Sequence, residues 1–143
     1  MNISDLIVNQ DTYRTECCET VLEVARAMVS RNVGAVPVLR DGRLVGIFSE
    51  RDLMSRVVAE GLDPRTTQVE QVMTKDPLTV VPSETVENCM GLMRRHGFRH
   101  LLICEGDCVV SVVSLRDIVL HDLGEKDYEV RMMRAYIQAS PEV

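Results

Sequence analysis

The fold is decided by a stretch that occurs twice, as DGRLVGIFSERDL at residues 41–53 and as GDCVVSVVSLRDI at residues 106–118. Each copy has a turn pair that contains glycine, an apolar run and then the pattern Ser-x-Arg-Asp. A turn followed by such a run predicts a hairpin strand, and the polar pattern after it predicts the start of a helix. A shift of 65 residues pairs 11–53 with 76–118 and gives nine identities in 43 positions without a gap. The chain therefore consists of two copies of one unit.

Both copies contain the same predicted elements in the same order. Helical spacing of apolar residues covers positions 21–29 in the first copy, and in the second it covers Val86, Cys89, Met90 and Met93. We expect Ser83 to cap the second of these helices, which runs to about His96 and ends at Gly97. Two strands follow, at 33–39 and 44–48 or at 98–104 and 109–113, joined by Asp41-Gly42 or Gly106-Asp107. A further helix is predicted at 52–60 and at 117–123.

These elements predict an α/β (α+β) fold of two pseudo-symmetric repeats, each helix, strand, strand and helix, packed through their sheets. The expected boundaries are 1–60 for the first repeat, 61–68 for a linker, 69–123 for the second repeat and 124–143 for a C-terminal helical tail. A unit of this size buries too little core to be stable alone. We therefore expect the two halves to pack on each other.

The tail, residues 125–139, places apolar side chains at helical spacing. These are Tyr128, Met132, Met133, Tyr136 and Ile137. Two interpretations remain open: the tail covers its own module, or it forms a dimer contact.

Composition excludes several classes of function. With 45% hydrophobic and 27% charged residues, the 143-residue chain is an ordinary globular protein. The aromatic content of 3% and the net charge of −6 disfavour any nucleic-acid partner. The sequence contains no apolar run of about 18 residues and begins with an acidic segment, so we expect no membrane partner and a cytoplasmic location. The five cysteines form no CxxC pair, which argues against a zinc site or a disulfide framework.

Three stretches together carry a resemblance to a known family. They are GAVPV at residues 34–38, the repeated stretch at 41–53 and the link QVMTKDPLTV at 71–80. With the duplication, they resemble the tandem cystathionine-β-synthase (CBS) domain pair, or Bateman module, from about Ile3 to Leu120. The tail is similar to the ends of small stand-alone bacterial and archaeal members of this family.

The resemblance implies a binding module that catalyses no reaction and needs no metal or catalytic cofactor. In this family, two pseudo-twofold clefts between the repeats hold adenosine-containing ligands such as AMP, ADP, ATP, NAD or S-adenosylmethionine. Ligand occupancy changes the shape or assembly of the module. The implied partners are an adenine nucleotide, a second copy in a homodimer and a separate effector protein.

The family's binding residues carry over to this sequence as follows. Asp52 and Asp117 would accept hydrogen bonds from ribose hydroxyls, because a carboxylate has acceptor capacity for two vicinal hydroxyls. Ser49 and Ser114 would contact ribose or phosphate, and Arg51 and Arg116 would supply positive charge beside a helix N-terminus. The adenine slot would be lined by Gly34, Ala35, Val36, Pro37, Arg99, His100, Leu101 and Leu102. Thr79, and with it Thr15 and Thr74, would close the cleft.

Each of these features also has a purely structural interpretation. Ser-x-x-Asp is a variant of the capping box, which satisfies helix N–H groups without a ligand. The second copy lacks the family's usual Pro at Leu102 and usual Gly at Ser111, so we expect two unequal sites, and which one dominates stays open. A structural dimerisation module with vestigial clefts is the competing function. An enzyme is disfavoured, since the sequence pairs none of its three histidines with a nucleophile or metal-ligand pattern.

Overall fold

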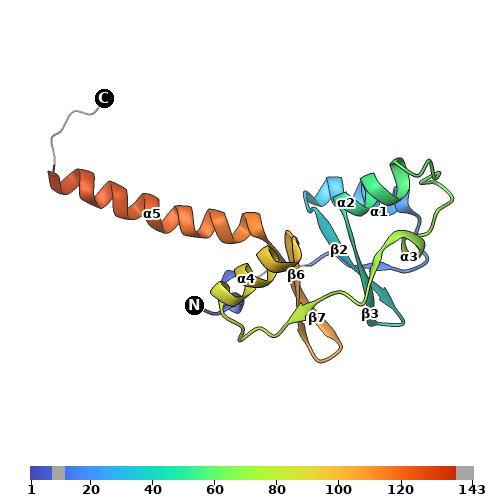
Figure 1. Ribbon diagram of the computed structural model, residues 1–143, viewed down its shortest axis with the longest axis horizontal. Helices are drawn as coiled ribbons and strands as arrows, with labels where there is room; N and C mark the ends of the chain where they lie inside the picture. Colours follow the sequence, from blue (N-terminus) through green and yellow to red (C-terminus); the bar gives the residue numbers. More distant parts are fainter. Residues whose placement is uncertain (8–11, 138–143) are drawn as a thin grey trace.

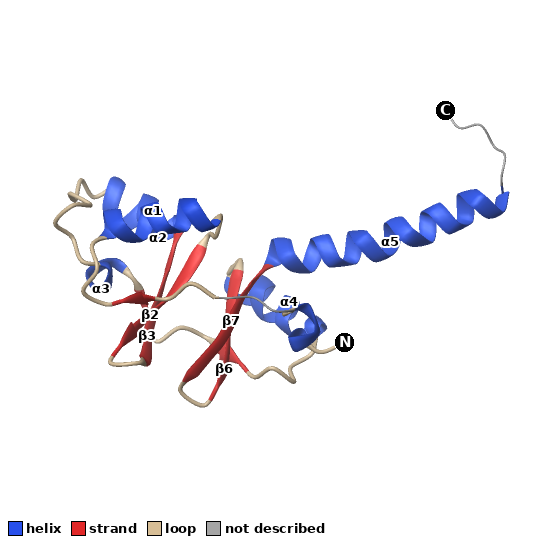
Figure 2. Ribbon diagram, turned by 180° about the vertical axis from the view of Figure 1, so that it is seen from behind, coloured by secondary structure: helices blue, strands red, loops and turns tan. Residues whose placement is uncertain are grey.

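Two small sheets, each flanked by helices, form the body of the protein, and one long helix extends away from it (Figures 1 and 2). The computed structural model describes residues 1–7 and 12–137, without the side chains of Leu123, Glu125, Lys126, Tyr128, Tyr136 and Ile137. The first part of the chain contains η1 (Ile3–Leu6), β1 (Thr15–Glu16), α1 (Val21–Arg31), β2 (Ala35–Arg40), β3 (Arg43–Ser49), α2 (Glu50–Asp52) and η2 (Leu53–Val58). The second contains α3 (Val69–Val72), β4 (Thr74–Lys75), β5 (Thr79–Val80), α4 (Val86–His96), β6 (His100–Glu105), β7 (Cys108–Ser114) and α5 (Leu115–Ile137).

The two sheets have the same topology at their centres. In the first, β1 runs parallel to β2, which pairs antiparallel with β3, and β4 adds to the far edge. In the second, β5 runs parallel to β6, which pairs antiparallel with β7. The predicted α/β fold with one hairpin in each repeat is therefore confirmed. The three short strands β1, β4 and β5 were not predicted. Each has only two residues, which is too short to show an alternation of apolar and polar residues.

Each hairpin has a bulge at the equivalent position, but the two turns differ. The register shifts between Val38 and Leu39 in the first hairpin and between Ile103 and Cys104 in the second, which are equivalent positions. The first turn places both Asp41 and Gly42 at positive φ, as a type I′ turn requires. In the second turn Gly106 takes a positive φ of 61°. Both turns lie where the sequence predicts them.

The first helix of each repeat begins at an equivalent threonine. Thr20 accepts a hydrogen bond from the backbone N–H of Glu23, and Thr85 accepts one from that of Asn88. The prediction that Ser83 is the N-cap is therefore wrong: α4 begins two residues later, because the apolar period starts at Val86, directly after Thr85. The predicted end of α4 at Gly97 is confirmed, with φ at 71°.

The last helices of the two repeats differ from each other and from the prediction. In the first repeat the helix begins at Glu50 and widens into a π-helical turn over Leu53–Val58, where the N–H of Ala59 bonds to the carbonyl of Met54. In the second repeat the predicted helix at 117–123 and the predicted tail helix form one continuous helix, α5. Gly124 does not interrupt it, since an isolated glycine weakens a helix without ending it.

Each repeat completes its core with the first residues of the other repeat. Val69, Val72 and Met73, at the start of the second repeat, pack into the core of the first with Val36 and Phe48. The N-terminal Ile3 is fully buried in the core of the second repeat. A third cluster joins the repeats, where Leu102, Cys104 and Val109 meet Leu39, Leu44 and Ile47. The expected packing of the two halves is thus an exchange of segments as well as a contact between sheets.

The described part of α5 beyond the body contradicts one interpretation of the tail. Val130, Met132 and Met133 are exposed, and both views show the helix leaving the body (Figures 1 and 2). This part of the tail does not cover its own module. The side chains of Tyr128, Tyr136 and Ile137 and all of 138–143 lie outside the described residues. Among the helices that are described, none combines the length and the apolar character needed to cross a membrane.

Candidate functional site

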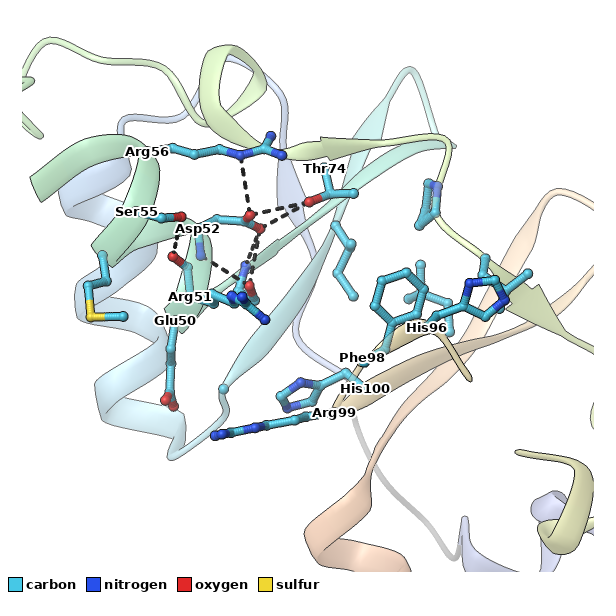
Figure 3. A pocket seen from close by; sticks show the side chains of 18 residues that line it. Glu50, Arg51, Asp52, Ser55, Arg56, Thr74, His96, Phe98, Arg99 and His100 are labelled. Carbon is cyan, nitrogen blue, oxygen red and sulfur yellow. Dashed lines mark hydrogen bonds and ion pairs between the residues drawn. The ribbon is translucent and has the colours of Figure 1, made fainter. Parts of the chain in front are cut away.

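A cleft with a volume of about 900 Å³ opens between the two repeats. One wall runs from the end of β3 through α2 and η2 to β4, and the other runs from the end of α4 into β6 (Figure 3). Small-molecule cavities in proteins have volumes of about 300–1,000 Å³. The lining residues are Gly34, Ile47, Ser49, Glu50, Arg51, Asp52, Met54, Ser55, Arg56, Thr74, Pro77, Leu78, His96, Gly97, Phe98, Arg99, His100 and Leu102.

The first repeat places a capped carboxylate in the wall of this cleft. The hydroxyl oxygen of Ser49, at the end of β3, accepts a hydrogen bond from the backbone N–H of Asp52 at 3.2 Å. Oδ2 of Asp52 accepts in return from the Ser49 backbone N–H at 3.0 Å and from its hydroxyl at 3.1 Å. This reciprocal pair is a capping box, which satisfies N–H groups at the start of a helix. The cap also fixes the position of the Asp52 carboxylate.

Two groups from other segments orient the same carboxylate. The hydroxyl of Thr74, in β4, donates to Oδ1 of Asp52 at 3.2 Å. Arg56, one turn further along the helix, holds Nε 3.7 Å from Oδ1 while its Nη1 donates to the carbonyl of Met73 at 2.7 Å. Asp52 is only 7% exposed, and a carboxylate has about four acceptor sites. Ser49 and Thr74 fill three of these sites, so about one acceptor site on Asp52 remains for a ligand.

The second repeat brings an arginine and a histidine to the facing wall. Arg99 precedes β6 and His100 begins it, and Figure 3 shows both across the cleft from Thr74, near Glu50. Among the described residues, the side chains of Arg51 and Arg99 have no hydrogen bond or ion pair. A guanidinium with its donors available matches the geometry of a phosphate. The cleft thus presents an acceptor at one wall and anion-binding donors at the other.

Gly34 leaves the space in which the His100 ring lies against the first repeat. A Cβ at this position would lie 2.9 Å from Oε1 of Glu50 and 3.2 Å from Nε2 of His100. Gly34 is thus a site of close approach for side chains from both repeats. Any larger residue at position 34 would have to move the imidazole or the carboxylate.

The environment of His100 lowers its pKa below the ordinary value of an imidazole. Burial is the main cause; Glu50 and Asp117 offset it in part, and Arg99 adds to it. The unperturbed pKa of histidine is about 6.5, so His100 is neutral at pH 7 when the cleft holds no anion. A phosphate bound beside the ring would favour the imidazolium form and raise this pKa.

A pair of stacked rings forms the mouth of the cleft. The rings of His96 and Phe98 have centroids 5.4 Å apart and planes 15° from parallel. Phe98 is 41% exposed although it is a large apolar residue. Gly97 between them takes the left-handed conformation that ends α4, which turns both rings toward the cleft (Figure 3). The exposed ring face is a surface on which a flat heterocycle can stack.

Comparison with known proteins identifies this arrangement of two repeats around a cleft. A family model described as "CBS domain" matches residues 6–59 and 69–124. The chain belongs to the CBS-domain family. The CBS domain-containing protein YhcV of Bacillus subtilis is 32% identical over 122 residues, 82% of this chain and 86% of YhcV. The mitochondrial CBS domain-containing protein CBSX3 of Arabidopsis thaliana is 31% identical over 125 residues, 84% of this chain, and the match spans only 61% of CBSX3.

A CBS structure solved with a bound nucleotide is among those that this chain resembles. The CBS domain protein PAE2072 from Pyrobaculum aerophilum, in complex with AMP, matches with a TM-score of 0.74 and 27% identity. The match covers 87% of this chain and 99% of PAE2072. The CBS-pair fold expected from the resemblance is therefore confirmed.

The second CBS repeat has the same cap in different surroundings. Oδ2 of Asp117 accepts from the backbone N–H of Ser114, and Ser114 accepts from that of Asp117, both at 3.0 Å. Asp117 is exposed, and neither it nor Ser114 nor Arg116 lines the cleft. The position equivalent to Thr74 is Asn9, which lies outside the described residues.

The structure brings together eight of the residues predicted from the sequence. They are Gly34, Ser49, Arg51, Asp52, Thr74, Arg99, His100 and Leu102. The remaining strand residues lie inside the body, because β2 and β6 are covered on both faces: Ala35, Val36, Pro37 and Leu101 are buried. Thr15 is buried and donates to Glu19 at 2.7 Å, whereas Thr79 is exposed in β5.

Sequence reasoning missed several lining residues. Arg56 follows Asp52 at i+4, a spacing that signals a neighbour on the same helix face. Phe98 was assigned to a strand, although an exposed aromatic beside Arg99 indicates a surface for a ligand. Pro77 and Leu78 reach the cleft only because the segment between the repeats folds over it, and no local pattern signals that.

Proposed function

We propose that this chain is a regulatory module that binds an adenine nucleotide (AMP, ADP, ATP or NAD) in the cleft between its two CBS repeats. The observation that carries the proposal is a fixed carboxylate, Asp52 with Thr74, that faces the Arg99 guanidinium and the His100 imidazole across one cavity. A nucleotide has hydroxyls for the first pair and phosphate for the second. The AMP complex of the relative PAE2072 supports the assignment.

The ribose would bind at Asp52. Its carboxylate is already oriented by Ser49, Thr74 and Arg56, so a ligand meets a preorganised acceptor. One ribose hydroxyl would donate a charge-assisted hydrogen bond, which is the stronger class, to the remaining acceptor site, and the vicinal hydroxyl would take the place of the Thr74 hydroxyl. The Arg56 guanidinium beside it offsets part of its negative charge, which reduces the repulsion of an anionic ligand.

The phosphate would bind at Arg99 and His100, with Arg51 within the same cleft. Three arginines line the cavity against the two carboxylates Glu50 and Asp52. This excess of positive charge favours an anionic nucleotide over S-adenosylmethionine, whose sulfonium and ammonium groups are cationic. The module is thus expected to select for phosphate rather than for the adenosyl group alone.

The adenine ring would lie on the apolar part of the lining. Ile47, Leu78 and Leu102 contribute aliphatic surface, and Phe98 contributes an exposed ring. Stacking on an aromatic side chain stabilises a base by about 1–3 kcal/mol. Together these contacts account for the base, the sugar and the phosphate of one nucleotide.

A ligand in this cleft would touch both repeats at once. Asp52 belongs to the first repeat and Arg99 to the second, so occupancy favours the arrangement in which these walls lie close. A ligand shifts such an equilibrium only by its different affinities for the two arrangements. The changed arrangement would then be read by a separate effector protein. The cytoplasmic location and the homodimer expected from the sequence stay predictions.

A scaffold with vestigial clefts is the competing proposal. It is favoured by the caps themselves, since Ser114 and Asp117 form one without lining the cleft. A scaffold would bind no nucleotide, and its Ser-x-x-Asp motifs would contribute only to folding.

Isothermal titration of the full chain with AMP, ADP, ATP, NAD, S-adenosylmethionine and adenosine separates the two functions. We expect binding of at least one nucleotide and much weaker binding of adenosine, which lacks phosphate. Arg99→Gln should weaken the bound nucleotide at least tenfold. Arg94→Gln is the matched control, because Arg94 is exposed on α4 and does not line the cleft; it should change the affinity less than twofold. No heat with any ligand, or equal losses in the two variants, would contradict the proposal.

A further inference from the structure

The two oxygens of the Asp52 carboxylate are occupied to different extents. Oδ2 accepts from the backbone N–H of Ser49 at 3.0 Å and from the hydroxyl of Ser49 at 3.1 Å. The hydroxyl of Thr74 donates to Oδ1 at 3.2 Å, and Nε of Arg56, at 3.7 Å, is too distant for a hydrogen bond. A carboxylate oxygen has about two acceptor sites. The helix cap therefore fills Oδ2, and about one site is left on Oδ1.

The hydrogen bond from Thr74 to Asp52 also attaches a segment that joins the two repeats. Thr74 and Lys75 form β4 at one edge of the first sheet, and β5, which begins at Thr79, forms one edge of the second. Figure 1 shows the chain passing from one sheet to the other between these strands. We call residues 74–80 the connecting segment. An edge strand of two residues has low local stability, so β4 depends on contacts beyond its pairing with β3.

Side chains from the wall of the cleft supply such contacts. Nη1 of Arg56 donates to the carbonyl of the buried Met73, directly before the connecting segment, at 2.7 Å. The Thr74 hydroxyl adds the bond to Asp52. Asp76 then takes a φ of 48°, which bends the backbone immediately after β4. Loss of the Thr74 bond would therefore loosen β4 at the point where the connecting segment leaves the first sheet.

We propose that Thr74 makes the module respond to ribonucleotides and not to deoxynucleotides. The proposal rests on the proposed function, because it requires the sugar to bind at Asp52. A sugar with one hydroxyl fits the free site on Oδ1 and leaves Thr74 in place. A sugar with two vicinal hydroxyls has to displace the Thr74 hydroxyl, since the cap holds Oδ2. Binding of a ribonucleotide thus releases β4 and changes the segment that joins the repeats.

This exchange of one hydroxyl for another has a consequence for affinity. In wild type, the bond that the second sugar hydroxyl gains is offset by the bond that Thr74 loses. AMP and 2′-deoxy-AMP should therefore bind with affinities within about threefold of each other, although hydrogen bonds to a charged group belong to the stronger class. In a variant without the Thr74 hydroxyl the second bond is not offset. AMP should then bind at least tenfold more tightly than 2′-deoxy-AMP.

Isothermal titration of the full chain with AMP, 2′-deoxy-AMP and 3′-deoxy-AMP measures these ratios. Thr74→Ala removes the hydroxyl. Thr74→Ser is the matched control, because both variants lose the same methyl group and only serine keeps a hydroxyl; its ratio should stay within about threefold. The two deoxynucleotides should behave alike, since each retains one hydroxyl. The same ratio in wild type, Thr74→Ser and Thr74→Ala would overturn the inference.

Hydrogen exchange measured by mass spectrometry tests the release of β4 in wild type, independently of any variant. At equal saturation, peptides that cover residues 74–80 should exchange several-fold faster with AMP than with either deoxynucleotide. The comparison between ligands cancels the protection that any bound nucleotide gives to Pro77 and Leu78, which line the cleft. Equal exchange with the three ligands would show that Thr74 stays in place and would overturn the inference.

The two proposals fail in different ways. If none of the three nucleotides binds to wild type, the proposed function fails and the role of Thr74 fails with it. If the nucleotides bind with unchanged ratios and equal exchange, only the role of Thr74 is overturned, and the nucleotide site is retained.

Discussion

The cap at Ser49–Asp52 and the cap at Ser114–Asp117 have nearly the same internal geometry. In both, the serine backbone N–H donates to the aspartate at 3.0 Å, and the return bond to the serine oxygen is 3.2 Å in the first and 3.0 Å in the second. Their surroundings differ. Asp52 is 7% exposed and bonds to Thr74, whereas Asp117 is exposed.

The difference separates what a motif does for folding from what it does for binding. A Ser-x-x-Asp motif satisfies helix N–H groups wherever a helix starts, so both copies have a structural reason to exist. At the first copy, β4 and the opposite repeat complete a cavity around the carboxylate, and this cavity is not lined by Asp117. The function of the motif thus depends on segments far away in the sequence.

The largest expected effect is on nucleotide affinity at the two aspartates. Asp52→Asn keeps an oxygen for the cap but removes the charged acceptor for the ribose hydroxyls. Hydrogen bonds to charged groups contribute about 1.5–3 kcal/mol, so we expect a loss of affinity of roughly 100-fold, or about 2.7 kcal/mol. Asp117→Asn should change it less than threefold. Titration calorimetry on both variants measures the contrast; equal losses would mean that the two caps do not differ in function.

The next effect is on stability, at another pair of equivalent positions. A Cβ at Gly46 would lie 2.5 Å from Sδ of Met73 and 2.8 Å from the carbonyl oxygen of Thr74. In the second repeat the equivalent residue is Ser111. It is fully buried and accepts a hydrogen bond from Thr12. Gly46→Ser should therefore destabilise the fold by about 2 kcal/mol through overpacking.

Urea denaturation measures this pair of exchanges. The reverse exchange, Ser111→Gly, should cost about 1 kcal/mol, from the freedom that glycine adds to a strand and the lost hydrogen bond. A smaller loss for Gly46→Ser than for Ser111→Gly would show that β4 does not press on β3 as described.

The two N-caps should respond alike, because their geometry is the same. Thr20 and Thr85 each accept a backbone N–H bond at 3.2 Å. Replacing either with alanine should lower the free energy of unfolding by about 1 kcal/mol. Ser83→Ala is the control and should have little effect, since Ser83 is not the cap. If Ser83→Ala cost more than Thr85→Ala, the start of α4 would be misplaced.

The smallest expected effect is a pH dependence of nucleotide affinity that arises from His100, in the second-repeat wall of the cleft. Burial lowers the pKa of His100, and a bound phosphate would raise it, so binding takes up a proton. Nucleotide affinity should then increase several-fold as pH falls from 8 toward 6. Without ligand the sign is opposite: the depressed pKa lowers the free energy of unfolding as pH falls below about 6.5.

His100→Gln isolates this contribution, because the titration of the nucleotide's own phosphate is common to both proteins. Calorimetric titrations at several pH values should show a flatter profile in the variant. Parallel profiles would assign the pH dependence to the phosphate alone.

The sequence predicts what is local and repeated. The duplication, the hairpins with their turns, the end of α4 at Gly97 and the caps all follow from short-range patterns that occur twice. The start of α4 was misplaced because Ser83 and Thr85 are both good caps, and only the apolar period decides between them. The continuity of α5 was missed because Gly124 is typical of a boundary, although neighbouring turns of helix maintain it.

The site was predicted only where local pattern and cavity coincide. Asp52, Ser49 and Arg99 could be named because the motif and the charges are visible in the sequence. Thr74 was named from the resemblance, and its contact with Asp52 depends on how β4 pairs with β3. Leu78 and Phe98 could not be assigned, since their approach is a result of how the repeats pack.

The central claim is that the Ser49–Asp52 motif binds a nucleotide in addition to capping a helix. A crystal structure of the full chain grown with AMP tests it most directly. We expect the nucleotide in the cleft, with its ribose hydroxyls on the Asp52 carboxylate and its phosphate at Arg99 and His100. Density for AMP at Ser114–Asp117 with the first cleft empty, or no nucleotide in a crystal saturated with AMP, would contradict the account.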